Sequence, residues 1–189
     1  MTQDAVIRSP TTSGASIRSA DSADVPAIAA IFNHAIEHTT ASFWTEPRPE
    51  HEIADAMADA GDRYPWLVAE AKAVADNAIA GFAWSKPWSP RCGYASAVEV
   101  SVYVAEAHRG RGVGGELYRA LLEALRKRGF RSAIAAIALP NEASVRLHER
   151  RGFRHAGTLE AVGEKFGRVL DVGYWQVRLN QEERPPWRP

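Results

Sequence analysis

The stretch His108-Arg109-Gly110-Arg111-Gly112-Val113-Gly114-Gly115 separates a strand-like run, residues 98–104, from a helix-like run, residues 116–128. Glycine lets the backbone approach a ligand closely and turn its N–H groups outward. The start of a helix adds unpaired N–H groups and the positive end of the helix dipole, and the two arginines add charge. The stretch therefore predicts a turn that binds a phosphate-bearing ligand.

Three kinds of phosphate-binding turn compete for this stretch. Gly110, Gly112 and Gly115 match the dinucleotide pattern G-x-G-x-x-G, which also needs an acidic residue roughly 20 residues later, and residues 130–138 contain none. A P-loop needs a Gly-Lys pair, which the sequence lacks. The third pattern, R-x-x-G-x-G, occurs in acyl-CoA-dependent N-acetyltransferases, and Arg109, Gly112 and Gly114 match it in order. A glycine-rich loop without a ligand is the remaining alternative.

Composition limits the classes of protein to which the chain can belong. With 189 residues, 46% of them hydrophobic, the sequence suits one globular domain with a sizeable core. The formal net charge of +0 argues against nucleic acid as the main partner. The single cysteine, Cys92, excludes an intrachain disulfide. With neither a signal-peptide pattern nor a membrane-spanning apolar run, we expect a cytoplasmic protein without a membrane partner.

The order of predicted elements indicates one domain over residues 15–180. Residues 1–14 are expected to be disordered, and residues 181–189 form a polar, proline-rich tail. Helices are predicted after Asp21 or Ser22, after Pro49, over 116–128 and from Pro140 to about Arg151. Alternation and apolar runs predict strands at 16–18, 66–71, 79–84, 98–104, 132–138, 153–162 and 169–179. We expect a mixed sheet with helices on both faces.

Several segments along these elements resemble one known family. In chain order they are YPWLVAE (64–70), SVYV (101–104), GELY (115–118), LPN (139–141), SVRLHE (144–149) and DVGYWQ (171–176). Through them, residues 16–179 resemble the GNAT superfamily of N-acetyltransferases, and within it the phosphinothricin and methionine sulfoximine acetyltransferases. The resemblance implies an α/β (α+β) domain, whose mixed, mostly antiparallel seven-stranded sheet splays apart between its fourth and fifth strands.

The same resemblance implies an activity. The enzyme would use acetyl-CoA and no metal. It would transfer the acetyl group directly, in a ternary complex, to the α-amino group of a small amino-acid-like substrate, such as phosphinothricin, methionine sulfoximine or methionine sulfone. It would also form a homodimer. The alternatives are acetylation of protein N-termini or other amines, and a non-catalytic acyl-CoA-binding sensor.

The implied cofactor site combines a strand edge, the glycine-rich turn and the start of a later helix. For Asn141, capping of that helix is an equally good interpretation, and one side chain could serve both purposes. A backbone N–H near Tyr103 or Val104 is the implied oxyanion donor. The implied cofactor-binding residues are Val102, Tyr103, Val104, Arg109, Gly110, Arg111, Gly112, Val113, Gly114, Gly115, Asn141 and Ser144.

Glu99 and His148 are the candidate catalytic residues. Strand alternation separates the valines of 98–104 from a polar face that carries Glu99, Ser101 and Tyr103. A carboxylate on that face could accept a proton from a substrate ammonium, although strand glutamates more often face solvent. His148 occupies the position where many superfamily members place a tyrosine near the CoA sulfur. Imidazole can act as acid or base, so the assignment of the base stays open.

Candidate substrate residues come from two loops. The resemblance implies that Phe43 and Trp44 line the pocket and that Arg91 and Tyr94 contact the substrate, although core packing or a solvated loop would explain each one separately. The chain departs from the phosphinothricin enzymes at Ser89, where they carry lysine, at Ala138, where they carry glycine, and in a longer hairpin near 74–77. One fewer cation suggests a substrate less acidic than phosphinothricin. His34 and His38 are interpreted as surface or pocket-rim residues.

Overall fold

The computed structural model describes residues 14–71 and 78–180. Residues 1–13 of the predicted disordered segment 1–14 lie outside the described residues, and so do the hairpin turn near 74–77 and the tail 181–189.

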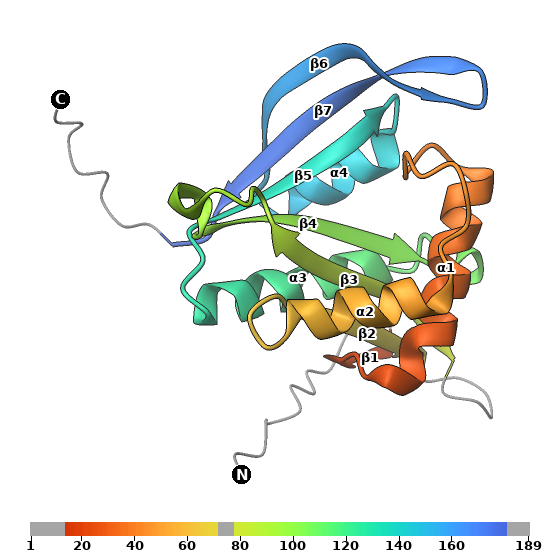
Figure 1. Cartoon of the computed structure of the whole chain (residues 1–189), viewed down its shortest axis with the longest axis vertical. Helices are drawn as coiled ribbons and strands as arrows, with labels where there is room; N and C mark the ends of the chain where they lie inside the picture. Colours follow the sequence, from red (N-terminus) through yellow and green to blue (C-terminus); the bar gives the residue numbers. More distant parts are fainter. Residues whose placement is uncertain (1–13, 72–77, 181–189) are drawn as a thin grey trace, which may run out of the picture.

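A seven-stranded sheet runs through the described part of the chain in the order β1-β2-β3-β4-β5-β7-β6 (Figure 1). Neighbouring strands are antiparallel except β4 and β5, which are parallel. The predicted mixed, mostly antiparallel sheet is confirmed. The strands are β1 (Ala15–Ser19), β2 (Trp66–Ala71), β3 (Ile79–Pro87), β4 (Ala97–Val104), β5 (Ser132–Leu139), β6 (Arg154–Lys165) and β7 (Arg168–Arg178).

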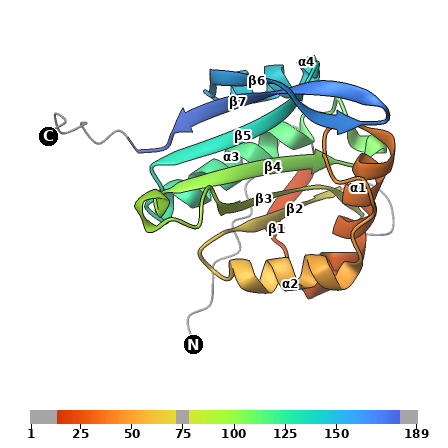
Figure 2. The same ribbon diagram turned by 45° about the horizontal axis from the view of Figure 1, so that its top comes forward.

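Helices cover both faces of the sheet, as predicted (Figure 2). One face packs against α3 (Val113–Lys127) and α4 (Glu142–Arg150), and the other against α1 (Val25–His38) and α2 (Glu50–Ala60). Each face has its own apolar cluster. Leu117, Leu121 and Leu125 of α3 belong to the larger cluster, while Ile28 of α1 and Ile53 of α2 belong to the smaller one.

The predicted alternation of β4 is confirmed. Val98 and Val100 are buried in the larger cluster, and Val102 and Val104 pack against it. Tyr103 packs against the smaller cluster on the opposite face. Hydrophobic side chains on both faces of β4 therefore anchor this strand between the two layers of helices.

Two of the predicted helix starts are wrong. Asp21 accepts a hydrogen bond from Ala23 N–H, but it caps a short 3-10 turn, η1 (Ser22–Asp24), and α1 begins only at Val25. Helix α3 begins at Val113 rather than at residue 116, so two glycines lie in its first turn. Glycine is a poor helix former, and local sequence alone therefore places the start too late.

Candidate active site

Strands β4 and β5 pair over a short length and then separate. Their register covers Ala97↔Ser132, Val98↔Ala133 and Glu99↔Ile134. From Val100 onward, β4 has no strand partner on this side among the described residues, although it continues to pair with β3. The sheet therefore opens between its fourth and fifth strands, as predicted, and Glu99 lies at the point of opening.

The open edge of β4 presents the backbone of alternate residues. Ala105 N–H donates to the Ala80 carbonyl, which fixes the alternation of the antiparallel ladder with β3. Ser101 and Tyr103 then direct their backbone groups to β3, whereas Val102 and Val104 direct theirs to the opening. Arg109 Nε donates to the Val104 carbonyl at 3.3 Å, which agrees with this orientation. Val102 and Val104 therefore offer strand-type hydrogen bonds to an extended ligand.

The glycine-rich turn delivers the first turn of α3 to the same end of β4. Gly112, the N-cap, has a φ of +85°, a conformation that glycine adopts without strain. The first intrahelical bond joins Glu116 N–H to the Gly112 carbonyl, so the N–H groups of Val113, Gly114 and Gly115 precede it. These donors and the helix dipole suit a phosphate. The turn thus fits the pyrophosphate of a CoA-type ligand.

The glycines in this turn also permit close packing. A Cβ on Gly114 would lie 3.3 Å from Cδ2 of Leu147 and 3.4 Å from Cγ2 of Val104. A Cβ on Gly115 would collide with Nη2 of Arg151. The first turn of α3 is therefore pressed against α4 and β4, and this tertiary packing supports a helix start that glycine would otherwise disfavour.

The Glu99 carboxylate forms an ion pair with a lysine on the neighbouring strand. Its side chain is 25% exposed, and Oε1 lies 3.1 Å from Nζ of Lys86, the residue opposite it on β3. The sequence prediction ended this strand at residue 84 and so missed Lys86. The structure thus presents a half-buried carboxylate, next to a lysine, where β4 and β5 part.

His148 lies in the interior, where both of its ring nitrogens have partners. Nδ1 is 2.7 Å from the Ser144 carbonyl, which can only accept, so Nδ1 carries the proton. Nε2 is 2.7 Å from the Tyr118 hydroxyl and therefore accepts from it when the ring is neutral. Burial lowers the pKa of His148, which favours that neutral ring. Tyr118 is a contact that sequence reasoning missed.

Two tyrosines lie within electrostatic range of Glu99. Burial raises the pKa of Tyr103 to about 12, and the nearby Glu99 carboxylate adds to the shift. Burial also raises the pKa of Tyr118, with smaller contributions from Tyr103 and Glu99. Both hydroxyls are therefore protonated at neutral pH. Tyr118 belongs to the larger apolar cluster and Tyr103 packs against the smaller one, so the two tyrosines lie on opposite faces of the sheet.

The start of α4 places polar groups next to His148. Asn141 Oδ1 accepts a hydrogen bond from Ser144 N–H at 3.1 Å, so its predicted capping role is confirmed. This bond uses only the oxygen and leaves the amide nitrogen for a ligand. Ser144 Oγ lies 3.4 Å from Nδ1 of His148, one helical turn further along. Asn141, Ser144 and His148 therefore follow each other along α4.

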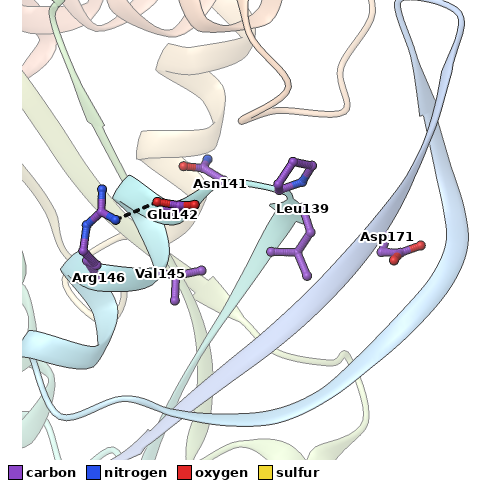
Figure 3. A pocket seen from close by; sticks show the side chains of 7 residues that line it. Leu139, Asn141, Glu142, Val145, Arg146 and Asp171 are labelled. Atoms are coloured by element: carbon purple, nitrogen blue, oxygen red, sulfur yellow. Dashed lines mark hydrogen bonds and ion pairs between the residues drawn. The ribbon is translucent and has the colours of Figure 1, made fainter.

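A pocket of about 470 Å³ lies where β5 passes into α4 (Figure 3). Its wall includes an ion pair between Arg146 and Glu142 at 2.8 Å, and Asp171 approaches from β7. Of the predicted site residues, only Asn141 lines it. The pocket therefore shares Asn141 with the predicted cofactor site, and its lining includes neither Glu99 nor His148. Its lining residues are Leu139, Pro140, Asn141, Glu142, Val145, Arg146 and Asp171.

The predicted substrate residues do not form one contact group. Phe43 lies in the loop between α1 and α2, and its ring rests on Gly163 of β6. Trp44 is half exposed, with the Arg48 guanidinium 3.8 Å from its ring centroid. Arg91 and Tyr94 are exposed at the far end of β4, around the 3-10 turn η2 (Cys92–Tyr94). Figures 1 and 2 show the two loops at opposite ends of β4.

The predicted surface histidines interact with each other. The rings of His34 and His38 meet edge to face, and His34 Nε2 is 3.3 Å from a carboxylate oxygen of Glu106. Across residues 14–71 and 78–180, no group of three or more His, Cys, Asp and Glu side chains is arranged to hold a metal ion. Within the same ranges, no helix combines the length and apolar character needed to cross a membrane.

Comparisons with known proteins agree with this geometry. The profile of the acetyltransferase (GNAT) family matches residues 31–153. A phosphinothricin N-acetyltransferase of Streptomyces viridochromogenes is 45% identical over 174 residues, which are 92% of this chain and 93% of that protein. An L-methionine sulfoximine/L-methionine sulfone acetyltransferase of Pseudomonas paraeruginosa is 41% identical over 91% of this chain and 99% of its own.

The fold also matches a solved structure that contains the acetyl donor. A GNAT superfamily phosphinothricin acetyltransferase from Sinorhizobium meliloti, crystallised in complex with acetyl-CoA, superimposes with a TM-score of 0.85. It is 31% identical in sequence, and the match covers 90% of this chain and 91% of that one.

Proposed function

From the premise that this chain belongs to the acetyltransferase (GNAT) family and is an N-acetyltransferase, we propose that it acetylates the α-amino group of a small amino-acid-like substrate. The substrate is of the phosphinothricin, methionine sulfoximine or methionine sulfone type, and acetyl-CoA is the donor. One observation carries the proposal: Glu99 lies where β4 leaves β5, beside backbone groups and helix N–H donors that suit a CoA-type ligand.

Three parts of the chain hold the donor. Acetyl-CoA supplies the acetyl group as a reactive thioester. The N–H groups of Val113, Gly114 and Gly115 bind its pyrophosphate at the positive end of α3. The backbone of Val102 and Val104 binds the pantetheine amides as a neighbouring strand would. At the start of α4, the Asn141 amide nitrogen donates a hydrogen bond to the cofactor. Arg109 and Arg111, both exposed beside the turn, supply positive charge.

Glu99 is the proposed general base. An amine attacks a thioester only as the neutral amine, so the substrate ammonium must first lose a proton. The Glu99 carboxylate lies at the opening, within electrostatic range of the Tyr103 and Tyr118 hydroxyls. Lys86 at 3.1 Å holds the carboxylate in place. Of the two predicted oxyanion donors, the Tyr103 N–H is directed to β3, so the Val104 N–H, which is directed to the opening, is the proposed donor.

His148 is proposed to act together with Tyr118. A neutral ring whose Nδ1–H is bonded to Ser144 has no proton to release from Nε2. The proton of this pair is then on the Tyr118 hydroxyl: its O–H bond breaks as the proton passes to the departing thiolate, and the oxygen regains a proton from the attacking nitrogen, which must lose one to become an amide. This arrangement favours Glu99 as the base and the Tyr118–His148 pair as the group that returns a proton to the departing thiolate.

The substrate end is proposed to involve Phe43, Trp44, Arg91 and Tyr94. Arginine and a phenol suit the carboxylate of an amino acid, and aromatic rings suit its side chain. Because Ser89 replaces a lysine of the phosphinothricin enzymes, we propose a preference for methionine sulfoximine or methionine sulfone over phosphinothricin. A clear preference for phosphinothricin in kcat/KM would contradict this proposal.

The test is thiol release from acetyl-CoA with a panel of acceptors. The panel contains methionine sulfoximine, methionine sulfone, phosphinothricin, ordinary amino acids and a peptide with a free N-terminus. We expect turnover with the sulfur-containing acceptors and intersecting double-reciprocal plots, which indicate a ternary complex. Release with the peptide alone would contradict the proposed substrate class, and parallel plots would contradict direct transfer.

We further propose a cytoplasmic homodimer, as the family resemblance implies. Light scattering coupled to gel filtration would give twice the chain mass of 20.7 kDa. A single-chain mass at micromolar concentration would contradict the dimer.

A further inference from the structure

A buried lysine near the tip of the β6–β7 hairpin contacts the loop that carries Phe43 and Trp44. Lys165, at the end of β6, is 3% exposed, and its Nζ donates to the Ser42 carbonyl at 2.5 Å. Both ribbon views show the hairpin reaching the segment that follows α1 (Figures 1 and 2). A charged side chain far along the sequence therefore holds the backbone of this loop.

A second contact of β6 holds the same loop independently. Gly163 lies two residues before Lys165, and a Cβ at this position would collide with the ring of Phe43. The Phe43 ring thus rests directly on the β6 backbone. Gly163 fixes the aromatic side chain by shape, while Lys165 fixes the preceding carbonyl by a hydrogen bond.

Ser42 connects this hairpin to β4. It is 6% exposed, and its hydroxyl accepts from Trp44 N–H at 3.3 Å. Its side chain is also hydrogen-bonded to Tyr103, which lies on the same face of β4 as Glu99. The chain of contacts therefore runs from Lys165 through Ser42 to Trp44 and Tyr103.

The charge of Lys165 is costly in this position. Among the described residues no carboxylate pairs with it; its contacts are the Ser42 carbonyl and the Phe166 ring, whose centroid is 5.1 Å from Nζ. Burial accordingly lowers the pKa of Lys165. An apolar side chain would fill the space at lower cost, so the distinctive contribution of lysine is the strong donor to Ser42.

We propose that Lys165 is a positioning residue for the acceptor substrate: it fixes the loop at 42–44 and thereby sets where Phe43 and Trp44 lie. This inference rests on the proposed function, because it takes these two aromatic residues as part of the acceptor site. It adds a residue from the β6–β7 hairpin, outside both predicted substrate loops.

The test compares Lys165→Met with the wild-type enzyme. KM for the acceptor should rise on the order of tenfold, the size of one charge-assisted hydrogen bond, while kcat changes less and the Kd for acetyl-CoA stays the same. Lys165→Arg, which keeps a cationic donor, should restore part of the KM. Lys127→Met is the matched control, since Lys127 is exposed on α3 and pairs with Glu123, and its KM should equal that of wild type.

Two further measurements keep the test decisive. Gly163→Ala, which leaves the charge in place, should also raise the acceptor KM because it displaces Phe43. Amide hydrogen exchange without any substrate should be faster at Trp44 in Lys165→Met than in wild type, provided that calorimetry shows a folded variant. This readout holds even if no acceptor of the proposed class is turned over.

Two results would overturn the inference. One is an unchanged KM together with unchanged exchange at Trp44 in Lys165→Met. The other is a loss confined to acceptors that carry a free carboxylate, with esters and amides of the same acceptors unaffected, because this pattern would make Lys165 a direct ligand of the substrate.

Discussion

Glu99 occupies the last position at which β4 still pairs with β5, and its carboxylate faces Lys86. Glutamine has the same shape but cannot accept a proton from an ammonium group. We therefore expect Glu99→Gln to lower kcat by roughly 10²- to 10⁴-fold, the usual contribution of a general base. Steady-state kinetics would measure the loss, and calorimetry should find a nearly unchanged Kd for acetyl-CoA.

Glu123→Gln provides the matched control for this substitution. Glu123 also pairs with a lysine, Lys127 at 2.8 Å, but it lies exposed on α3, away from the opening. Its kcat should equal that of wild type. A large loss of acetyl-CoA affinity in Glu99→Gln would instead assign Glu99 to cofactor binding.

His148 makes stability depend on pH. Burial lowers its pKa in the folded protein below the unfolded value near 6.5. Above that value both states hold the neutral ring, and the stabilisation is fully present. As the pH falls below 6.5, the unfolded chain binds a proton that the native ring resists, so the free energy of unfolding falls by up to about 1.4 kcal/mol per pH unit. The loss levels off below the folded pKa.

Urea unfolding between pH 8 and pH 5 would measure this effect. His148→Gln cannot titrate at this position, although it loses the bond to Tyr118. The stability advantage of wild type over the variant should therefore shrink as the pH falls. An advantage that is constant across the whole range would show that His148 titrates normally in the folded state.

At the scale of elements, α3 has a left-handed glycine at each end. Gly112 at the N-cap has a φ of +85°, and Gly129, just past the C-cap, has a φ of +80°. Alanine at either position should destabilise the fold by roughly 1–2 kcal/mol. Only Gly112→Ala should also raise the Kd for acetyl-CoA, because only that end presents N–H groups to a phosphate.

Gly129→Ala is therefore the internal control for the same helix. Calorimetric melting would show a similar loss in both variants, and titration with acetyl-CoA would separate them. Equal affinities would contradict the assignment of the α3 N-terminus to the pyrophosphate.

Sequence patterns predicted the elements better than their ends. The alternation of β4 and the helix-like run at 116–128 are local properties of the sequence, and both elements are present in the structure. The start of α3 depends instead on Leu147 and Val104, which pack against Gly114 from distant parts of the chain. The continuation of β3 to Lys86 likewise depends on its pairing with Glu99. Such contacts have no local sequence signal.

At the scale of the molecule, the candidate site residues stay a prediction, and the sequence did not predict how the structure arranges them. Glu99 lies within β4 where the sheet opens, the glycine-rich turn follows β4, and Asn141 starts α4. Phe43 and Arg91 lie on loops at opposite ends of β4 (Figure 2). No pattern within either loop predicts that the two loops lie apart. Tyr118 and Lys165 were missed because their partners are on other elements.

The opening also divides the sheet into two parts, β1–β4 and β5–β7, that the donor should connect. A ligand bound to β4, to α3 and to Asn141 contacts both sides of the opening. At a concentration of 100 times its Kd, acetyl-CoA should add about 2.7 kcal/mol to the free energy of unfolding. The backbone amides that acetyl-CoA protects from hydrogen exchange should locate its binding site more specifically than this gain in stability does.

Hydrogen exchange at single amides of β4 tests where the pantetheine arm binds. Without ligand, the backbone N–H groups of Val102 and Val104 are directed to the opening, whereas those of Ser101 and Tyr103 are directed to β3. Acetyl-CoA should slow exchange at the two valines and leave the other two nearly unchanged. Adenosine 3′,5′-bisphosphate, which has phosphates but no pantetheine, should protect only the first turn of α3. Equal protection of all four β4 amides by acetyl-CoA would indicate general stiffening of the sheet, and would contradict a pantetheine arm paired along this edge.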